Sequence, residues 1–242
     1  MSQKEIITFE DTGGMAGFLS SFIAAQTETL TAGQLLNIAL SGGNTPKTIF
    51  EKVRLQHREQ INWQRIRFFQ VDERCVSPDD PQSNYRMISE SLLEGLGFPE
   101  NQFIRMKGEN DPEREATRYE ELLREILPSE GGWPVFDLIL LGLGNDGHTA
   151  SLFPGDEAIL RSLNCCEVAK HPESRQNRIT LTLPVINHAR TILFLVTGQE
   201  KAEVVANIFR QKIDLTLPAS LVNPAFGAVT WLIGKEAALL IS

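Results

Sequence analysis

Hydrophobic positions along the chain follow two alternating patterns. Short runs that are apolar at almost every position are typical of parallel strands covered on both faces. Between them lie longer segments with the apolar spacing of an amphipathic helix. We expect strands at residues 35–40, 66–71, 137–141, 167–169, 178–183, 191–196 and 228–233, and helices at residues 18–30, 46–55, 85–96, 113–127, 201–210 and 236–240. This alternation predicts an α/β fold, with a single Rossmann-like domain, a mostly parallel sheet and helices on both faces.

The patterning keeps the same character from end to end. The 242 residues are 42% hydrophobic and 22% charged, which is enough apolar material for a sizeable core. No internal repeat or linker is evident, and the best break, at residues 130–134, has strand and helix patterns on both sides. We therefore expect one domain over residues 1–242. No run of about eighteen apolar residues occurs, so we expect no membrane-spanning segment.

Charge and cysteine content narrow the possible functions. A net charge of −8 at pH 7 argues against a nucleic-acid partner. An anionic ligand would have to be held by a few local basic residues. Cys75, Cys165 and Cys166 lack the spacing of a zinc site and are interpreted as reduced thiols. Because the N-terminus also lacks the apolar stretch of a signal peptide, we expect a cytoplasmic protein.

The apolar run at residues 137–141 leads directly into a glycine-rich turn that carries Asp146 and His148. Ligands bind at the C-terminal ends of strands in open α/β sheets, so these two side chains are candidates for chemistry. The glycines also spell G-x-G-x-x-G, with Glu167 twenty residues after the last of them. A dinucleotide site is nevertheless disfavoured. The motif lies past mid-chain, Asp146 would face the pyrophosphate, and Pro154 would end the required helix early. Taken alone, a loop histidine such as His148 is more often a solvated or hydrogen-bonded structural residue than a catalytic one.

A second turn, Ser41-Gly-Gly-Asn-Thr-Pro46, joins a predicted strand to a predicted helix. Thr45 is a plausible N-cap, and Pro46 suits the first helical position. The glycines would let backbone N–H groups converge on an anion at the helix N-terminus. The spacing is not that of a Walker motif, and an ordinary strand-to-helix turn is an equally good interpretation. Lys47 either assists the anion or points to solvent.

Charged residues cluster at three further places. Asp72-Glu-Arg74 ends a buried strand, Arg178 opens another, and Lys201 lies at a helix start just after a glycine. The first group could be an ion-pair cluster that ties down the following loop, and the other two could be solvated surface charges. A cation at a helix N-terminus is mildly unfavourable unless an anion binds there, so Lys201 is a stronger candidate anion ligand than Arg178.

Taken together, these segments resemble the 6-phosphogluconolactonases over nearly the whole chain, in order and in spacing. The resemblance rests on residues 41–46, 72–74, 83–84, 142–154, 178–182 and 229–231. It implies a Rossmann-like fold shared with glucosamine-6-phosphate deaminase and related isomerases. Those deaminases carry a ring-opening glutamate just before the proline that follows Asp-Gly-His. Phe153 occupies this position here and can neither exchange protons nor pair with a charged histidine, which favours the lactonase.

The implied reaction is hydrolysis of 6-phospho-D-glucono-1,5-lactone to 6-phospho-D-gluconate in the oxidative pentose phosphate pathway. No G-x-S-x-G elbow is present, so we expect general-base activation of water, without a covalent intermediate. His148 is the expected base. Asp146 and Asp72 would orient either the histidine or the sugar hydroxyls, and Arg74 would serve either the phosphate or the oxyanion.

For the phosphate, the resemblance implies the residues Gly42, Gly43, Asn44, Thr45, Arg178 and Lys201. We expect no metal and no cofactor. The only expected partner is the small phosphosugar lactone, with no nucleic acid and no membrane, and the protein is expected to be a monomer or a weak homo-oligomer. Two other functions stay open: a deaminase or isomerase acting on a hexosamine phosphate, and a catalytically silent sugar-phosphate sensor.

Overall fold

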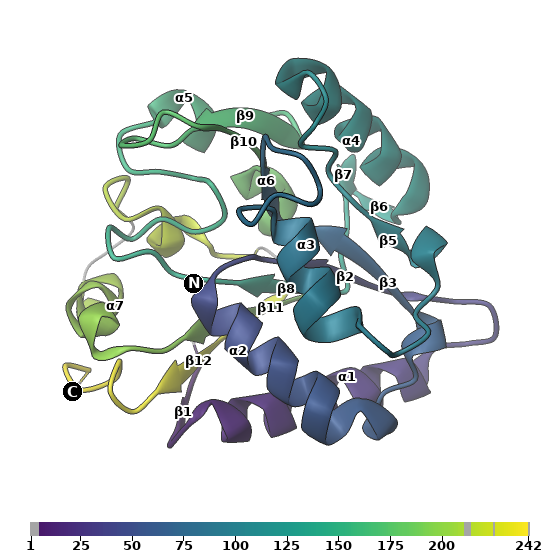
Figure 1. Cartoon of the computed structure of the whole chain (residues 1–242). Helices are drawn as coiled ribbons and strands as arrows, with labels where there is room; N and C mark the ends of the chain where they lie inside the picture. Colours follow the sequence, from purple (N-terminus) through teal and green to yellow (C-terminus); the bar gives the residue numbers. More distant parts are fainter. Residues whose placement is uncertain (1–4, 211–213, 225, 242) are drawn as a thin grey trace.

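The computed structural model describes residues 5–210, 214–224 and 226–241, and within these ranges a seven-stranded sheet forms the centre of the molecule (Figure 1). Its strand order is β1-β12-β11-β8-β2-β3-β5, and every pairing is parallel. The strands are β1 (Glu5–Phe9), β2 (Leu36–Leu40), β3 (Ile66–Gln70), β5 (Phe103–Ile104), β8 (Leu138–Leu141), β11 (Thr191–Val196) and β12 (Ala228–Gly234). The predicted α/β class is therefore confirmed.

Helices lie on both faces of this sheet. One face is covered by α1 (Thr12–Thr29), α2 (Asn44–Lys52) and α3 (Asn84–Ile88), the last two continuing into the π-helical turns η1 (Val53–His57) and η4 (Ser89–Leu93). The other face packs against α4 (Pro112–Ile126), α5 (Glu157–Leu160), α6 (Leu183–Ile186) and α7 (Ala202–Arg210). Short 3₁₀ turns complete the helical set: η2 (Arg58–Gln60), η3 (Trp63–Arg65), η5 (Glu100–Gln102), η6 (Gln199–Lys201) and η7 (Pro218–Leu221).

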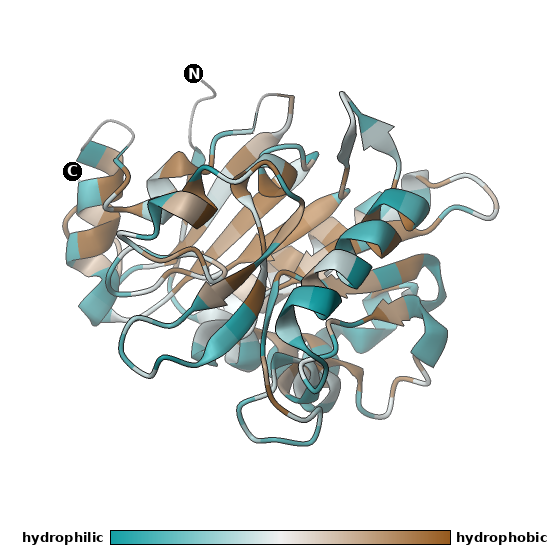
Figure 2. Ribbon diagram, turned by 90° about the horizontal axis from the view of Figure 1, so that it is seen from above, coloured by the Kyte–Doolittle hydropathy of each residue, from teal (hydrophilic) through white to brown (hydrophobic). Residues whose placement is uncertain are grey.

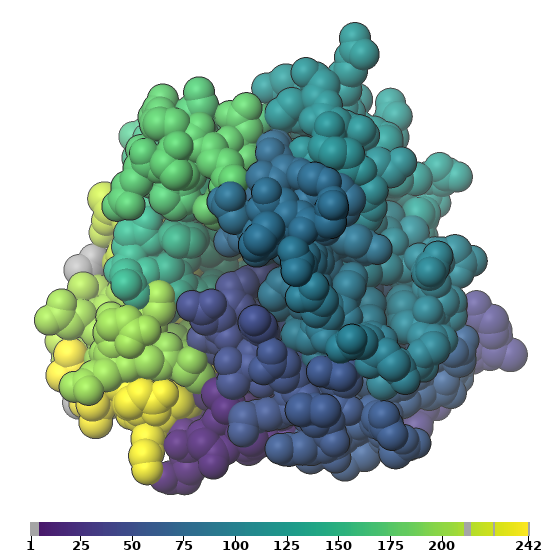
Figure 3. Space-filling view, viewed as in Figure 1, coloured from purple at the N-terminus to yellow at the C-terminus, as the bar shows by residue number. Residues whose placement is uncertain are grey.

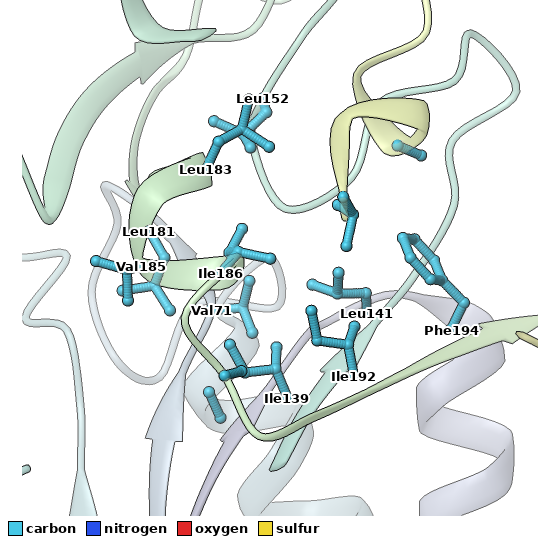
Figure 4. Close-up of a cluster of buried hydrophobic side chains, with 14 of the residues drawn as sticks. Val71, Ile139, Leu141, Leu152, Leu181, Leu183, Val185, Ile186, Ile192 and Phe194 are labelled. Atoms are coloured by element: carbon cyan, nitrogen blue, oxygen red, sulfur yellow. The ribbon is translucent and has the colours of Figure 1, made fainter. Parts of the chain in front are cut away.

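The continuous apolar runs are explained by two cores, one on each side of the sheet. Successive residues of a strand point to opposite faces, so Ile38 and Leu40 pack beneath α1 and α2 while Ala39 joins the opposite core. Figure 2 shows the apolar strands lying between helices whose outer surfaces are polar. Figure 4 shows Ile139 and Ile192 in one apolar cluster with Val185 and Ile186 of the α6 segment. Burying each such side chain stabilises the fold by about 1.5–3 kcal/mol.

A second, antiparallel sheet stands beside the C-terminal ends of the main strands. It has the order β4-β10-β9, formed by β4 (Asp72–Arg74), β10 (Asn177–Leu181) and β9 (Cys166–Lys170). In its register Arg74 lies opposite Arg178 and Asp72 lies opposite Thr180. A small hairpin of β6 (Ser129–Glu130) and β7 (Trp133–Pro134) lies in the segment that looked like the best domain break.

Most predicted elements appear within a few residues of their expected bounds, and the differences are of three kinds. The edge strands β1 and β5, the short strands β4, β6 and β7 and the short helices α5 and α6 were not predicted. The first helix begins at Thr12 because the Asp11 side chain accepts hydrogen bonds from the N–H groups of Gly13 and Gly14. The predicted helix at residues 236–240 is wrong. That segment forms consecutive turns after β12, in which the N–H groups of Ala237 and Ala238 bond to the carbonyl of Gly234.

Candidate active site

A cleft of about 370 Å³ opens at the C-terminal ends of β2, β8 and β11 and beside β4. The chain runs outward from β2 to β3 and β5 on one side, and from β8 to β11 and β12 on the other, so the strand order reverses between β2 and β8. Such a reversal is the usual binding position in open α/β sheets. Figure 3 shows a hollow where these segments meet. Every predicted site residue except Asp146 lines the cleft.

Asp146 reaches the site through His148. Its Oδ1 lies 2.6 Å from Nδ1 of the imidazole and accepts the backbone N–H of His148 at 3.1 Å. A carboxylate only accepts, so Nδ1 carries the proton of the neutral ring and Nε2 keeps its lone pair. Burial raises the pKa of Asp146, but hydrogen bonds and charge attraction from His148 outweigh it, and the pKa is lowered overall. Asp146 therefore stays ionised and orients a histidine that can accept a proton.

Gly144 makes room for this pair. A Cβ atom added there would lie 2.1 Å from Nδ1 of His148 and 2.6 Å from Oδ1 of Asp146. The Gly144 N–H also donates to the carbonyl of His148 at 2.8 Å, which closes the turn. The next helix after this turn is the four-residue α5. This agrees with the expectation that Pro154 prevents a long helix here.

The glycine turn after β2 differs from the prediction in its capping. The N-cap is Gly43, at φ +105°, and the helix already begins at Asn44. The predicted N-cap role of Thr45 is therefore wrong. Because Gly43 adopts the left-handed conformation, Thr45 falls inside the first helical turn, where its Oγ1 lies 2.7 Å from Oγ1 of Thr197. No side chain caps the helix, so its first N–H groups face the cleft without a capping oxygen.

Three basic side chains line the cleft. Arg74 and Arg178 face one another across β4 and β10, and each has a buried Nε without a hydrogen-bond partner among the described residues. Lys201 enters from the turn that precedes α7. Within the described ranges, none of the three forms an ion pair. Burial lowers the pKa of Arg178 and that of Lys201, although nearby carboxylates oppose this effect. Lys47 instead borders a neighbouring cavity together with Arg86.

Asp72 lines the cleft, but its carboxylate is hydrogen-bonded to residues other than His148. Its Oδ2 accepts the Ser151 hydroxyl at 2.6 Å, and its Oδ1 accepts the Asn84 amide at 3.2 Å. Asp72 is 5% exposed. Of the two carboxylates that could orient His148, only Asp146 is hydrogen-bonded to it in the described structure. Asn84 also leaves no room for a side chain at position 42, because a Cβ added to Gly42 would lie 1.8 Å from its Oδ1.

Sequence reasoning missed the part played by Glu73. This carboxylate is 2% exposed and accepts hydrogen bonds from the backbone N–H groups of Arg74, Asn84 and Tyr85 and from the side chains of Gln70 and Ser83. The alternative interpretation of the Asp-Glu-Arg cluster was that it ties down the following loop. Glu73 does so, through hydrogen bonds rather than ion pairs. The sequence feature that could have identified this role is a charged residue at the end of a buried strand.

Ser41 was also not singled out. Its hydroxyl is buried, lines the cleft and has no hydrogen-bond partner in the part of the chain that the structure describes. The sequence feature that could have identified Ser41 is its position at the end of the apolar β2 run, directly before the two glycines. In the part of the chain that the structure describes, no three His, Cys, Asp or Glu side chains gather to hold a metal ion. None of the described helices is long and apolar enough to cross a membrane.

The chain is similar to known proteins over most of its length. It is 42% identical over 200 residues to a 6-phosphogluconolactonase of Treponema pallidum, covering 83% of this chain and 82% of that protein. It is 39% identical over 208 residues to that of Haemophilus influenzae, covering 85% and 88%. The solved 6-phosphogluconolactonase of Trypanosoma brucei matches with a TM-score of 0.84 at 30% identity, covering 100% of both chains. The family model for glucosamine-6-phosphate isomerases/6-phosphogluconolactonase matches residues 12–231, and the chain belongs to this family.

Proposed function

We propose that this chain hydrolyses 6-phospho-D-glucono-1,5-lactone to 6-phospho-D-gluconate, the lactonase step of the oxidative pentose phosphate pathway. The observation that carries the proposal is the His148–Asp146 pair, because His148 lines a cleft whose basic residues form no ion pair among the described residues. The relatives named 6-phosphogluconolactonase, about 40% identical to this chain, support it.

His148 acts as the general base. Nε2 takes a proton from water, and the resulting hydroxide attacks the lactone carbonyl carbon to give a tetrahedral oxyanion. The carbonyl then reforms as the bond to the ring oxygen breaks, and that oxygen takes the proton from the imidazolium. The products are a hydroxyl group and a carboxylic acid that ionises at neutral pH. Asp146 keeps the imidazole in the required tautomer and stabilises its charged form.

The phosphate is held at the glycine turn. The uncapped N-terminus of α2 presents N–H groups at Gly43, Asn44 and Thr45, where the helix dipole favours a negative charge. Arg178 and Lys201 supply the counter-charges. A glycine is required at position 42, because the Asn84 side chain occupies the space that a Cβ atom would need.

Arg74 and Asp72 complete the site. Arg74 lies opposite Arg178, so we assign its guanidinium to the same anion rather than to the oxyanion. Asp72 has both carboxylate oxygens hydrogen-bonded and is assigned to the sugar hydroxyls rather than to His148. We further propose that the protein works in the cytoplasm, as one domain, without metal or cofactor, and as a monomer or weak homo-oligomer. Light scattering would measure its assembly state.

The decisive experiment follows freshly prepared lactone by NMR in the presence and absence of the protein. Because the lactone also hydrolyses spontaneously, the rate with His148→Ala protein is the matched control. Faster loss with the wild type alone supports the proposal. Release of ammonia from glucosamine 6-phosphate would instead identify a deaminase. Phosphosugar binding without any turnover would identify a sensor.

A further inference from the structure

The Phe153 ring joins two parts of the site although it does not line the cleft. It is 2% exposed and belongs to the loop that carries His148. Its centroid lies 5.0 Å from the His148 ring, at an interplanar angle of 54°. The guanidinium carbon of Arg178, from β10, lies 5.6 Å from the same centroid. One buried ring therefore contacts both the proposed base and a proposed phosphate ligand.

A third group supports the ring from the β9–β10 hairpin. The His171 ring packs against Phe153 in a T-shaped arrangement, with 5.2 Å between centroids and 72° between planes. Its Nδ1 accepts the backbone N–H groups of Glu173 and Ser174, so the hairpin fixes the orientation of this imidazole. Burial, together with the nearby Arg178 charge, lowers the pKa of His171. A lowered pKa favours the neutral imidazole, so His171 does not compete with Arg178 and protonated His148 for the aromatic face of Phe153.

The face of an aromatic ring is negative and attracts cations. Arg178 is a permanent cation whose Nε is buried without a partner, and within the described ranges it forms no ion pair. His148 becomes a cation during the proposed reaction, when it takes the proton from water. Both would be stabilised by the same ring. An aliphatic side chain of similar size would fill the space without that attraction.

We propose that Phe153 is a positioning residue that holds Arg178 toward the substrate phosphate and stabilises the imidazolium form of His148. This inference rests on the proposed function, because it assigns the ring to the base and the phosphate ligand of that reaction. It also gives the aromatic residue at this position a role beyond the mere absence of a carboxylate.

The test compares Phe153→Leu with Phe136→Leu. Phe136 is also buried in the same core, but its ring packs edge-on against Phe69 rather than against His148 and Arg178, so its variant reports the cost of losing a core ring. A cation–π contact corresponds to about twofold to thirtyfold in affinity. We expect Phe153→Leu to raise KM and the inhibition constant of inorganic phosphate by such a factor and to lower kcat. The acid limb of its kcat profile should move to lower pH, because protonated His148 loses stabilisation.

The groups that also influence this limb are Asp146 beside His148, and His171 and Arg178 from the hairpin; all three are unchanged in the variant. A trifluorinated phenylalanine at position 153 keeps the shape of the ring and weakens its negative face, so it tests the proposal if Phe153→Leu does not fold. It should shift KM, phosphate inhibition and the pH profile in the same directions as Phe153→Leu.

Three outcomes are distinguishable. Shifts in KM, phosphate inhibition and pH profile for the Phe153 variants, but not for Phe136→Leu, support the proposal. A lower melting temperature with these three quantities unchanged would overturn it and leave the ring a packing role. Failure of the proposed function would appear in the wild type, as no acceleration of lactone loss. Phosphate affinity measured by calorimetry would still test the contact with Arg178 in that case, and equal affinities for wild type and variants would overturn it.

Discussion

Arg74 and Arg178 lie directly opposite each other in the antiparallel pairing of β4 and β10. Like charges at opposite positions of a strand pair are destabilising. Within residues 5–210, 214–224 and 226–241, each guanidinium also has a buried Nε without a hydrogen-bond partner. A fold that places two such groups together at one cleft is expected to gain stability when an anion enters. We therefore propose that the small sheet binds an anion in addition to its structural role.

Replacing Arg178 with alanine should weaken substrate binding. A charged hydrogen bond contributes about 1.5–3 kcal/mol, so KM should rise about tenfold to a hundredfold with a smaller change in kcat. Inorganic phosphate should compete with substrate in the wild type and raise its melting temperature more than that of the variant. Lys170→Ala, an exposed change in the neighbouring strand β9, is the matched control. An unchanged KM in Arg178→Ala would remove this residue from the phosphate site.

Replacing His148 with alanine should act on turnover instead. The turn is built by Gly144, Gly147 and backbone hydrogen bonds, so we expect the fold and phosphate binding to persist. General-base catalysis contributes about 10²–10⁴, and kcat should fall by that factor with little change in KM. In the wild type kcat should fall as pH is lowered, because a protonated imidazole cannot accept a proton. Kinetics corrected for spontaneous hydrolysis, with a thermal melt, provide the measurement. If kcat of the variant lies within a few-fold of the wild-type value, His148 is not the general base and Asp72 becomes the next candidate.

The central strands could be predicted from the sequence because burial of a strand on both faces produces an apolar run within the strand itself. β2, β8 and β11 are buried on both faces, and continuous apolar runs record that directly. The edge strands were missed for the complementary reason. β1 has only exposed and half-buried residues, and β5 has two half-buried residues. Neither leaves a hydrophobic pattern that separates it from a loop.

The candidate site also contains some features that the sequence predicts and others that depend on the tertiary structure. His148 and the glycine turns were visible because they depend on residue types at the ends of recognisable strands. The contact between Asp146 and His148 spans only two residues and was also within reach of sequence reasoning. The hydrogen bond of Asp72 to Ser151 joins residues 79 positions apart and depends on how the small sheet folds back. The capping of α2 by Gly43 depends on a φ angle that the pattern of residue types left open.

Lys201 predicts a pH dependence at the alkaline side. Burial lowers its pKa in the folded protein, so the ammonium loses its proton at a lower pH than an exposed lysine does. In the window between the folded and unfolded pKa values the unfolded chain holds more protons, and stability rises with pH there. Anion binding should show the opposite trend, because neutral Lys201 no longer attracts phosphate. Affinity for 6-phosphogluconate should therefore fall in a window below pH 10.5, the ordinary lysine value.

Calorimetric titration of wild type and Lys201→Ala with 6-phosphogluconate, a product that does not hydrolyse further, measures this window. The variant should bind more weakly at neutral pH and should lack the alkaline decline. Lys201→Arg should also lack the decline while keeping most of the affinity, because a guanidinium stays charged. An identical decline in all three proteins would assign the pH effect to another group.

Glu73 predicts that one buried carboxylate sets both stability and substrate affinity. Burial raises its pKa, although its hydrogen bonds to backbone N–H groups and Gln70 act in the opposite direction. Because the folded pKa lies above the unfolded value, the folded protein holds more protons between the two. Stability therefore falls as pH rises through that window. Glu73→Gln should remove this dependence, which unfolding by denaturant at a series of pH values would reveal.

The same substitution should nevertheless destabilise the protein at neutral pH. Glutamine keeps one oxygen for the N–H groups of Arg74 and Asn84, but it places a donor where Oε2 now accepts from Tyr85 and Gln70. A buried donor left without a partner costs about 1–3 kcal/mol. Since Arg74 and Asn84 both line the cleft, KM should rise as well. Glu90→Gln, on the neighbouring turn η4 and more exposed, is the control that should leave KM unchanged. Loss of stability in Glu73→Gln with an unaltered KM would confine Glu73 to the fold.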